Sequence, residues 1–119
     1  MPRTLQNNIF YAELITEPGS NVQGGTRPVL VVSNDEHNLA SDTVTIIPLS
    51  TSQTKTRLPT HVWVDMDGLP RRSLVLCEQI NTINKSQLLN CIGSLNNEVD
   101  RKRIARAVEI QLGLDPRYK

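Results

Sequence analysis

Short β-strand patterns separated by loops rich in glycine and proline restrict the fold of this chain more than any other feature of its sequence. Each pattern places β-branched and other apolar residues in alternation or in short runs, and turn-forming residues bound it. The expected strands span residues 8–14, 28–34, 43–47, 60–64, 73–80 and 91–95. Such short strands favour a small, strongly curled antiparallel barrel over a doubly wound parallel sheet.

The C-terminal segment has the spacing of a helix instead. Asn97, with Asp100 three residues later, resembles a capping box. Apolar residues follow at the spacing of one helix face at Ile104, Val108 and Leu112. We expect a helix over about residues 97–113 that packs this stripe on the barrel, because a lone helix must bury one face. The chain of 119 residues then forms one β-rich α+β domain, with the barrel at about residues 8–95.

The segments between the expected strands give further local predictions. Residues 35–42 are polar and are expected to form a loop. The strand at 43–47 is expected to stop near Pro48, because proline cannot donate to a sheet ladder. Asn84 is expected to cap a short helix that ends at about Leu89.

Histidine and cysteine residues do not form a metal-binding pattern. His37 falls in the expected polar loop, and His61 falls on the expected outward side of a strand. Neither has a second ligand at metal spacing, and nothing marks either one for a Ser-His-Asp device. Cys77 and Cys91 are expected to be free, buried thiols. The sequence therefore predicts no metal and no cofactor.

Composition limits the classes of function. The net charge is +1, from 13 basic and 12 acidic residues, so nucleic-acid binding has to depend on a local cluster. One Phe, two Tyr and one Trp are too few for an extended base-stacking platform. The start of the chain lacks a secretory h-region, and no apolar run reaches the roughly 18 residues of a membrane span. We expect a cytoplasmic protein without membrane contact.

The segment Gly24-Gly25-Thr26-Arg27-Pro28 places a cation at the start of an apolar strand. The two glycines relax the backbone, and the proline after Arg27 fixes the chain as it enters the strand. A guanidinium held in this way suits a phosphate or a carboxylate. The alternative is a loop-to-strand junction whose arginine is only solvated.

Arg27 is one of three groups of polar residues at expected strand ends, together with Ser50-Thr51 and Glu78-Gln79. In a curled sheet these ends can meet at one rim. There Arg27 can pair with a phosphate, a hydroxyl can bond its oxygen, and Glu78 can accept a proton. Cleavage of RNA by its own 2′-hydroxyl needs little more, because the substrate carries the nucleophile. The alternatives are an ion pair between Glu78 and an arginine, and ordinary loop capping by Ser50-Thr51.

These residues resemble the MazF/PemK family of toxin endoribonucleases from toxin–antitoxin modules. The most specific motifs are Gly24-Gly25-Thr26-Arg27-Pro28 before a Val-rich strand, and Glu78-Gln79-Ile80 before Thr82-Ile83. The stretches that carry the resemblance are residues 10–14, 23–35, 48–50, 58–62 and 73–83. Their order and approximate spacing hold over roughly residues 9–112.

The resemblance implies a homodimer of small SH3-like barrels, each with a C-terminal helix. It also implies a metal-independent cytosolic RNase that cuts single-stranded mRNA at a short sequence and is neutralised by a MazE-like antitoxin peptide. Its catalytic residues fall on Arg27, Ser50 and Glu78. The residues expected to contact RNA are Gln23, Thr51, Gln53, Lys55 and Gln79.

The sequence departs from the family pattern at several positions. Gln6-Asn7-Asn8 stands where relatives commonly carry Arg-Gly-Asp, and Val22 stands where many have glutamate. Leu76 replaces an arginine that some relatives have, and Ser50 replaces the usual threonine. An attenuated homologue is therefore one alternative. Others are a barrel toxin that binds a protein such as gyrase, and an RNA-binding module without cleavage.

Overall fold

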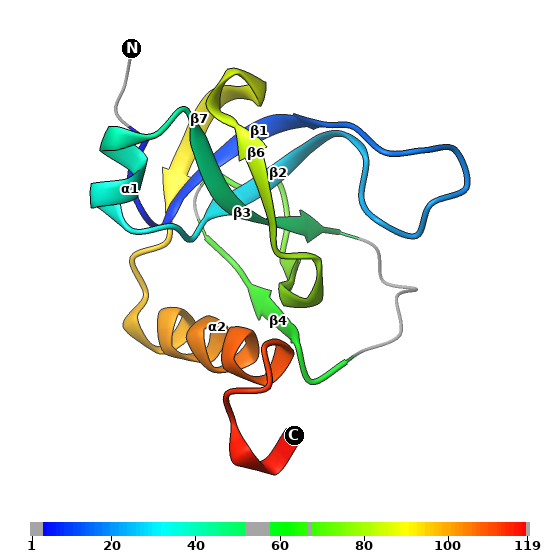
Figure 1. The fold of residues 1–119 in the computed structure, drawn as a ribbon, viewed down its shortest axis with the longest axis vertical. Coiled ribbons are helices and arrows are strands. Elements are labelled where there is room, and N and C mark those ends of the chain that lie inside the picture. Colours follow the sequence, from blue (N-terminus) through cyan, green and yellow to red (C-terminus); the bar gives the residue numbers. More distant parts are fainter. Residues whose placement is uncertain (1–3, 52–57, 67, 119) are drawn as a thin grey trace.

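The computed structural model describes residues 4–51, 58–66 and 68–118, and this part of the chain forms one seven-stranded antiparallel sheet (Figure 1). The strands are β1 Asn8–Leu14, β2 Gly25–Val31, β3 Thr43–Ser50, β4 His61–Val64, β5 Ser73–Leu76, β6 Asn81–Asn84 and β7 Leu88–Ser94. Their order is β4-β5-β3-β2-β1-β7, and β6 pairs with β3. The end strands β4 and β7 do not pair with each other, so the described sheet is open rather than a closed barrel. No described helix combines the length and apolar character needed to cross a membrane.

β1 and β2 form an antiparallel pair at the centre of the sheet, with Ile9 opposite Leu30. The expected strand at 8–14 is confirmed, whereas the one expected at 28–34 begins at Gly25 and ends at Val31. The last three residues of β2 are almost fully buried, as expected for a strand covered on both faces. The connection between the two strands, residues 15–24, extends away from the sheet (Figure 1). We call this segment the β1–β2 loop.

Pro48 does not end β3, so this prediction was wrong. The strand continues to Ser50, and Pro48 lies opposite Val29 of β2. On its other side, β3 pairs with β6 up to Ile46 and with β5 from Leu49. Pro48 therefore falls where β3 exchanges one partner for the other, and an irregularity of this kind tolerates a missing N–H.

Residues 35–42 are not a loop, because Asp35–Ala40 form helix α1. The side chain of Asn34 accepts the backbone N–H of His37 at 2.9 Å and caps this helix. The cap predicted at Asn84 is present, but it starts only the single 3-10 turn η2, Lys85–Gln87. Strand β7 begins directly after this turn.

Helix α2, Glu98–Gln111, packs on the face of the sheet that carries Ile9, Leu30 and Val62. The opposite face forms a second core cluster around Phe10 and Val44. Residues of β2 alternate between the two clusters, as the period of a strand requires.

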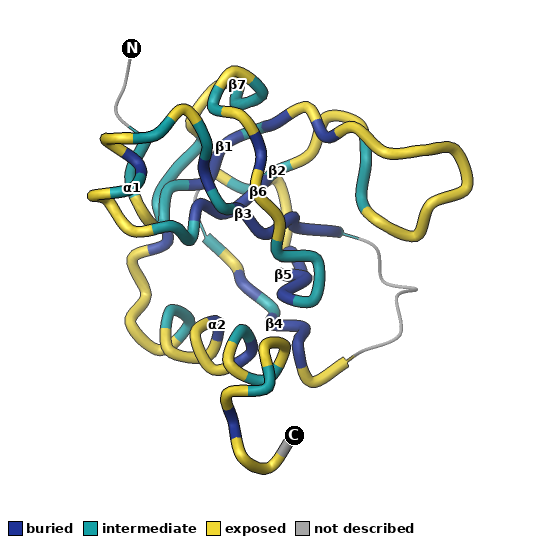
Figure 2. Tube along the Cα trace, viewed as in Figure 1, coloured by how far each residue is buried: buried dark blue, intermediate teal, exposed yellow. Residues whose placement is uncertain are grey.

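Most of the predicted helix is confirmed. Asn97 accepts the N–H of Asp100 at 3.1 Å. Ile104 and Ala107 are buried, and Val108 is partly buried against the core. Leu112 was expected in the same stripe but is 56% exposed, because it lies at the C-cap where the helix ends. Figure 2 shows that exposed stretches of α2 alternate along the helix with buried and intermediate ones.

The two cysteines differ in burial. Cys77 is buried as predicted, but the prediction for Cys91 was wrong, because its side chain is exposed. Cys91 lies on β7, which is an end strand and has only β1 beside it.

Candidate functional site

Arg27 lies at an exposed position of β2, opposite Ala12 of β1. The backbone before it favours glycine: Gly25 has φ of +75°, and a Cβ on Gly24 would meet Oγ1 of Thr16. The Nε of Arg27 donates to the carbonyl of Gly24 at 3.1 Å. Within the described part of the chain, the other guanidinium N–H groups have no protein partner and are available to an anion.

Gln79 connects the β1–β2 loop to the 3-10 turn η1, Cys77–Gln79, which follows β5. The backbone N–H of Gln23 donates to Oε1 of Gln79 at 2.8 Å. Nε2 of Gln79 donates in turn to the carbonyl of Asn21 at 3.4 Å. Two predicted RNA-contacting residues, Gln23 and Gln79, are thus brought together, and the segment that carries Arg27 is joined to the one that carries Glu78.

Glu78 is held by two side chains at the start of β4. Nε2 of His61 lies 2.9 Å from Oε2 of Glu78, and Oγ1 of Thr60 donates to Oε1 at 3.3 Å. The His61 side chain is 3% exposed and that of Glu78 is 24% exposed. The carboxylate is therefore fixed by two donors and still reaches solvent.

The outward orientation expected for His61 was wrong. Both α2 and η1 pack against β4, and the side chain of His61 lies against Glu78 of η1. Sequence reasoning did not find Thr60 and His61 as partners of the acid. The available signal was a polar pair at the start of an otherwise apolar strand, in a stretch that shared the family resemblance. Among the residues that the structure describes, Glu78 pairs with this histidine and with no arginine.

Ser50 and Arg27 lie at the same end of the β2–β3 pair. Val29 of β2 lies opposite Pro48 of β3. Because the strands are antiparallel, Arg27, two residues before Val29, and Ser50, two residues after Pro48, lie at the same end of the pair. Ser50 is buried and opposite Leu74 of β5, whereas Thr51 beyond it is half-buried. The other two predicted RNA contacts, Gln53 and Lys55, lie outside the described residues.

The three predicted catalytic residues do not form one row of strand ends. Glu78 follows β5 and lies beside β3 rather than past the C-terminal end of β3. The reason is that Val75 pairs with Leu49, and the antiparallel chain then runs back along β3 until Asn81 pairs with Ile46. The segment that carries Arg27 is connected to the one that carries Glu78 by the β1–β2 loop, through the hydrogen bond from Gln23 to Gln79.

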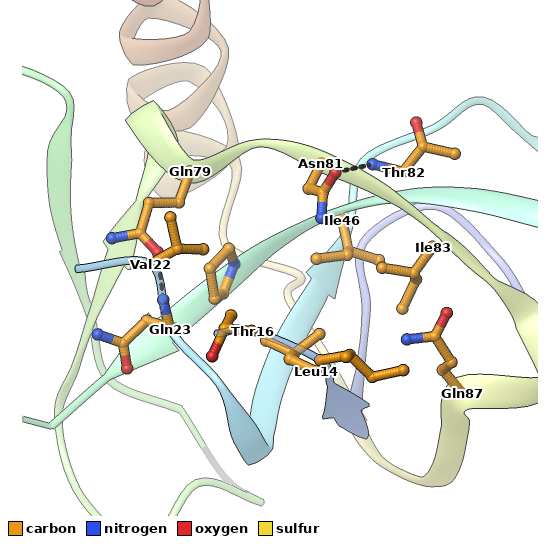
Figure 3. Close-up of a pocket in the computed structure, with 12 residues that line it drawn as sticks. Leu14, Thr16, Val22, Gln23, Ile46, Gln79, Asn81, Thr82, Ile83 and Gln87 are labelled. Atoms are coloured by element: carbon orange, nitrogen blue, oxygen red, sulfur yellow. Dashed lines mark hydrogen bonds between the residues drawn. The ribbon is translucent and has the colours of Figure 1, made fainter. Parts of the chain in front are cut away.

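A cleft of about 230 Å³ lies between the β1–β2 loop, β3 and β6 (Figure 3). Amide side chains of Gln23, Gln79 and Asn81 line it together with apolar side chains. Figure 3 shows Gln23 and Gln79 on one side of the cleft and Ile46 and Ile83 on the other. Planar amides around an apolar surface suit the edge and the face of a nucleobase.

Neither a reactive thiol at Cys77 nor a metal-binding cluster is found among the described residues. Burial, and then the neighbouring charge of Glu78, raise the pKa of Cys77 to about 12, so this thiol is not a nucleophile. Among the described residues, no three His, Cys, Asp or Glu side chains are placed to hold a metal ion.

Comparison with known proteins gives one consistent result. Residues 5–112 match the family described as "PemK-like, MazF-like toxin of type II toxin-antitoxin system". The chain is 39% identical to Endoribonuclease EndoA of Bacillus subtilis over 111 residues, which cover 92% of this chain and 94% of that protein. Its structure is similar to the Mycobacterium tuberculosis toxin MazF-mt6, with a TM-score of 0.75, 29% identity, and 91% and 98% of the two chains covered. It is also similar to a mycobacterial endoribonuclease solved in complex with its cognate antitoxin, with a TM-score of 0.73, 26% identity, and 93% and 96% of the chains covered.

Proposed function

Because this chain belongs to the family of PemK-like, MazF-like toxins of type II toxin–antitoxin systems, we propose that it is an endoribonuclease that cleaves single-stranded mRNA at a short sequence. The observation that carries this proposal is the link between two unlike groups. The Gln23–Gln79 hydrogen bond joins the segment of an exposed arginine to the segment of an oriented carboxylate. A cation and a proton acceptor are the two groups that RNA transesterification requires from a protein.

In the proposed reaction, the 2′-hydroxyl oxygen attacks the adjacent phosphorus while Glu78 accepts its proton. The 5′ oxygen of the next nucleotide leaves with the electron pair of its bond to phosphorus and takes a proton from solvent. Arg27 stabilises the charge on the pentacoordinate phosphate, and the Ser50 hydroxyl bonds a phosphate oxygen. The products are a 2′,3′-cyclic phosphate and a 5′-hydroxyl. No metal takes part in this scheme.

Bases next to the cut are proposed to enter the cleft between the β1–β2 loop and β6. Gln23 and Gln79 contact these bases in the cleft, and Thr51, Gln53 and Lys55 are proposed as further contacts to the RNA. In single-stranded RNA the base edges are free, so amide side chains can read them by hydrogen bonding.

Membership of this family suggests the oligomeric state, the cellular compartment and the protein partner of the chain. We propose that the chain acts in the cytoplasm as a homodimer and is neutralised by an antitoxin peptide. The mycobacterial relative in complex with its cognate antitoxin supports the last of these proposals. A disordered peptide can cover a groove of this kind as it folds on binding.

The test compares Arg27→Ala with Arg71→Ala, a matched exposed arginine before β5. Each protein is incubated with a long single-stranded RNA of varied sequence in EDTA, and the 5′ ends of the products are mapped. Arg27→Ala is expected to slow cleavage about 10²–10³-fold, as for other losses of a group that stabilises transition-state charge, and Arg71→Ala to cleave as wild type does.

Two outcomes contradict the proposal in different ways. Full activity of Arg27→Ala overturns the assignment of the site. No cleavage by wild type, with RNA binding or inhibition of gyrase instead, overturns the ribonuclease reading itself.

A further inference from the structure

We propose that His61 is a positioning residue that holds the Glu78 carboxylate in the orientation needed to accept a proton. This inference rests on the proposed ribonuclease function and assigns a role to a buried histidine outside the predicted site. His61 does not contact RNA in this proposal, because Leu58 and Glu78 already occupy its two ring nitrogens. It acts through Glu78.

The hydrogen bonds of His61 define which ring nitrogen carries the hydrogen. The backbone N–H of Leu58 donates to Nδ1 of His61 at 3.2 Å, so Nδ1 has to present a lone pair. The ring hydrogen is then on Nε2, which donates to Oε2 of Glu78 at 2.9 Å. In this arrangement the imidazole is neutral, and its contact with Glu78 is a directed hydrogen bond rather than an ion pair.

Two donors fix the plane of the carboxylate. His61 binds one oxygen of Glu78, and Oγ1 of Thr60 donates to the other at 3.3 Å. Both donors are buried at the start of β4, so the carboxylate cannot turn without breaking one bond. A proton acceptor held in place before substrate binds loses less freedom when the reaction begins. The same histidine also anchors the backbone at Leu58, where the chain enters β4.

A purely structural role for His61 makes a different prediction, and two substitutions separate the roles. Asparagine places its amide near the position of Nδ1, so His61→Asn can keep the bond from Leu58 but cannot reach Glu78. Glutamine extends to the position of Nε2, so His61→Gln can keep the donor to Glu78. Only the positioning role predicts that glutamine restores catalysis better than asparagine does.

The experiment measures kcat and KM for RNA cleavage by wild type, His61→Asn and His61→Gln, with unfolding midpoints as controls for folding. His37→Asn is the matched control, because that histidine lies on α1 and bonds Thr43. We expect His61→Asn to lower kcat about tenfold, the effect of one lost hydrogen bond to a charged group, with KM changed less than about twofold. His61→Gln is expected to stay within about threefold of wild type and His37→Asn to match it.

Equal activity of the two His61 variants, or a loss confined to KM, overturns the inference. Thr60→Val provides a second route if the His61 variants do not fold, and we expect kcat to fall about threefold because one weaker donor is lost. Unchanged kcat in Thr60→Val contradicts the proposal as well.

A measurement without substitution tests the geometry directly. In the full-length wild-type protein, ¹⁵N NMR of the imidazole is expected to show the Nε2–H tautomer, and an Nδ1–H tautomer or an imidazolium overturns the inference. Failure of the two proposals is distinguishable. Wild type that cleaves no RNA contradicts the proposed function and this role together, whereas normal cleavage with full activity in His61→Asn contradicts this role alone.

Discussion

The two sides of the proposed site are built in different ways. Arg27 is exposed near the start of β2, and its hydrogen bond within the described chain goes to Gly24, the last residue of the β1–β2 loop. Glu78 accepts bonds from Thr60 and His61, which come from another strand and are buried. The arginine thus depends on the backbone conformation of one loop, whereas the acid is fixed by the packed interior. Function and stability are expected to separate on the Arg27 side and to be coupled on the Glu78 side.

The largest effect is expected from Glu78→Ala. It removes the proton acceptor and lowers kcat by about 10²–10⁴-fold. It also leaves the buried Nε2–H of His61 without its acceptor, which costs about 1–3 kcal/mol of unfolding free energy. Arg27→Ala is expected to change that free energy by less than about 0.5 kcal/mol, because its side chain is exposed. Urea unfolding and RNA cleavage of both variants check this, and equal stability of the two would break the comparison.

Gly25→Ala tests the loop side alone. Gly25 has φ of +75°, and a Cβ there meets nothing within 4 Å, so the cost is backbone strain of about 1–2 kcal/mol rather than a clash. Because Arg27 follows two residues later, we expect cleavage to fall about tenfold as its position shifts. Gly113→Ala is the matched control, with φ of +69° in equally open space after α2. It should lose similar stability and keep full activity, and loss of activity in both variants would contradict the account.

Gln79→Leu tests the link between the two sides. It removes both hydrogen bonds to the β1–β2 loop while keeping the side chain nearly the same size. We expect kcat/KM to fall about fivefold, mainly through KM, because the β1–β2 loop, which precedes Arg27 and lines the cleft, is then less well ordered. Gln111→Leu, an exposed glutamine at the end of α2, is the control. A loss confined to kcat would show that Gln79 acts in the chemical step instead.

The smallest effect on cleavage is expected at Cys77, which is buried next to Glu78. Its pKa is raised from 9.0 to about 12, so the unfolded state loses the thiol proton at lower pH than the folded state does. The resulting stability is complete below about pH 9 and is lost as the pH rises toward 12. Wild type should therefore lose stability between these pH values more steeply than Cys77→Ser. A parallel pH dependence in the two proteins would contradict the shift.

The main elements of the fold could be predicted from local patterns. Strand β1 and the cap of α2 at Asn97 follow from β-branched residues and an asparagine before a helical repeat. Helix α1 could not be separated from a polar loop, because its six residues carry no apolar repeat. The continuation of β3 through Pro48 depends on where β5 and β6 meet it, which is a property of the tertiary structure.

The site was predictable as residue types but not as geometry. Arg27 and Glu78 stood out because charged side chains follow strand patterns or precede them. The bond from Gln23 to Gln79 and the burial of His61 arise between segments distant in the sequence. Alternation along 60–64 places His61 outside, and only the packing of α2 and η1 around β4 reverses this.

In the proposed reaction the 2′-hydroxyl of the RNA is the nucleophile, Arg27 stabilises the charge on phosphorus and Glu78 accepts the proton. The most direct test uses a short RNA that spans a mapped cut, in EDTA, beside a copy with one 2′-deoxy nucleotide on the 5′ side of that cut. We expect a 2′,3′-cyclic phosphate and a 5′-hydroxyl from the RNA and no cleavage of the deoxy copy. Cleavage of both at similar rates would contradict it, because water would then be the nucleophile.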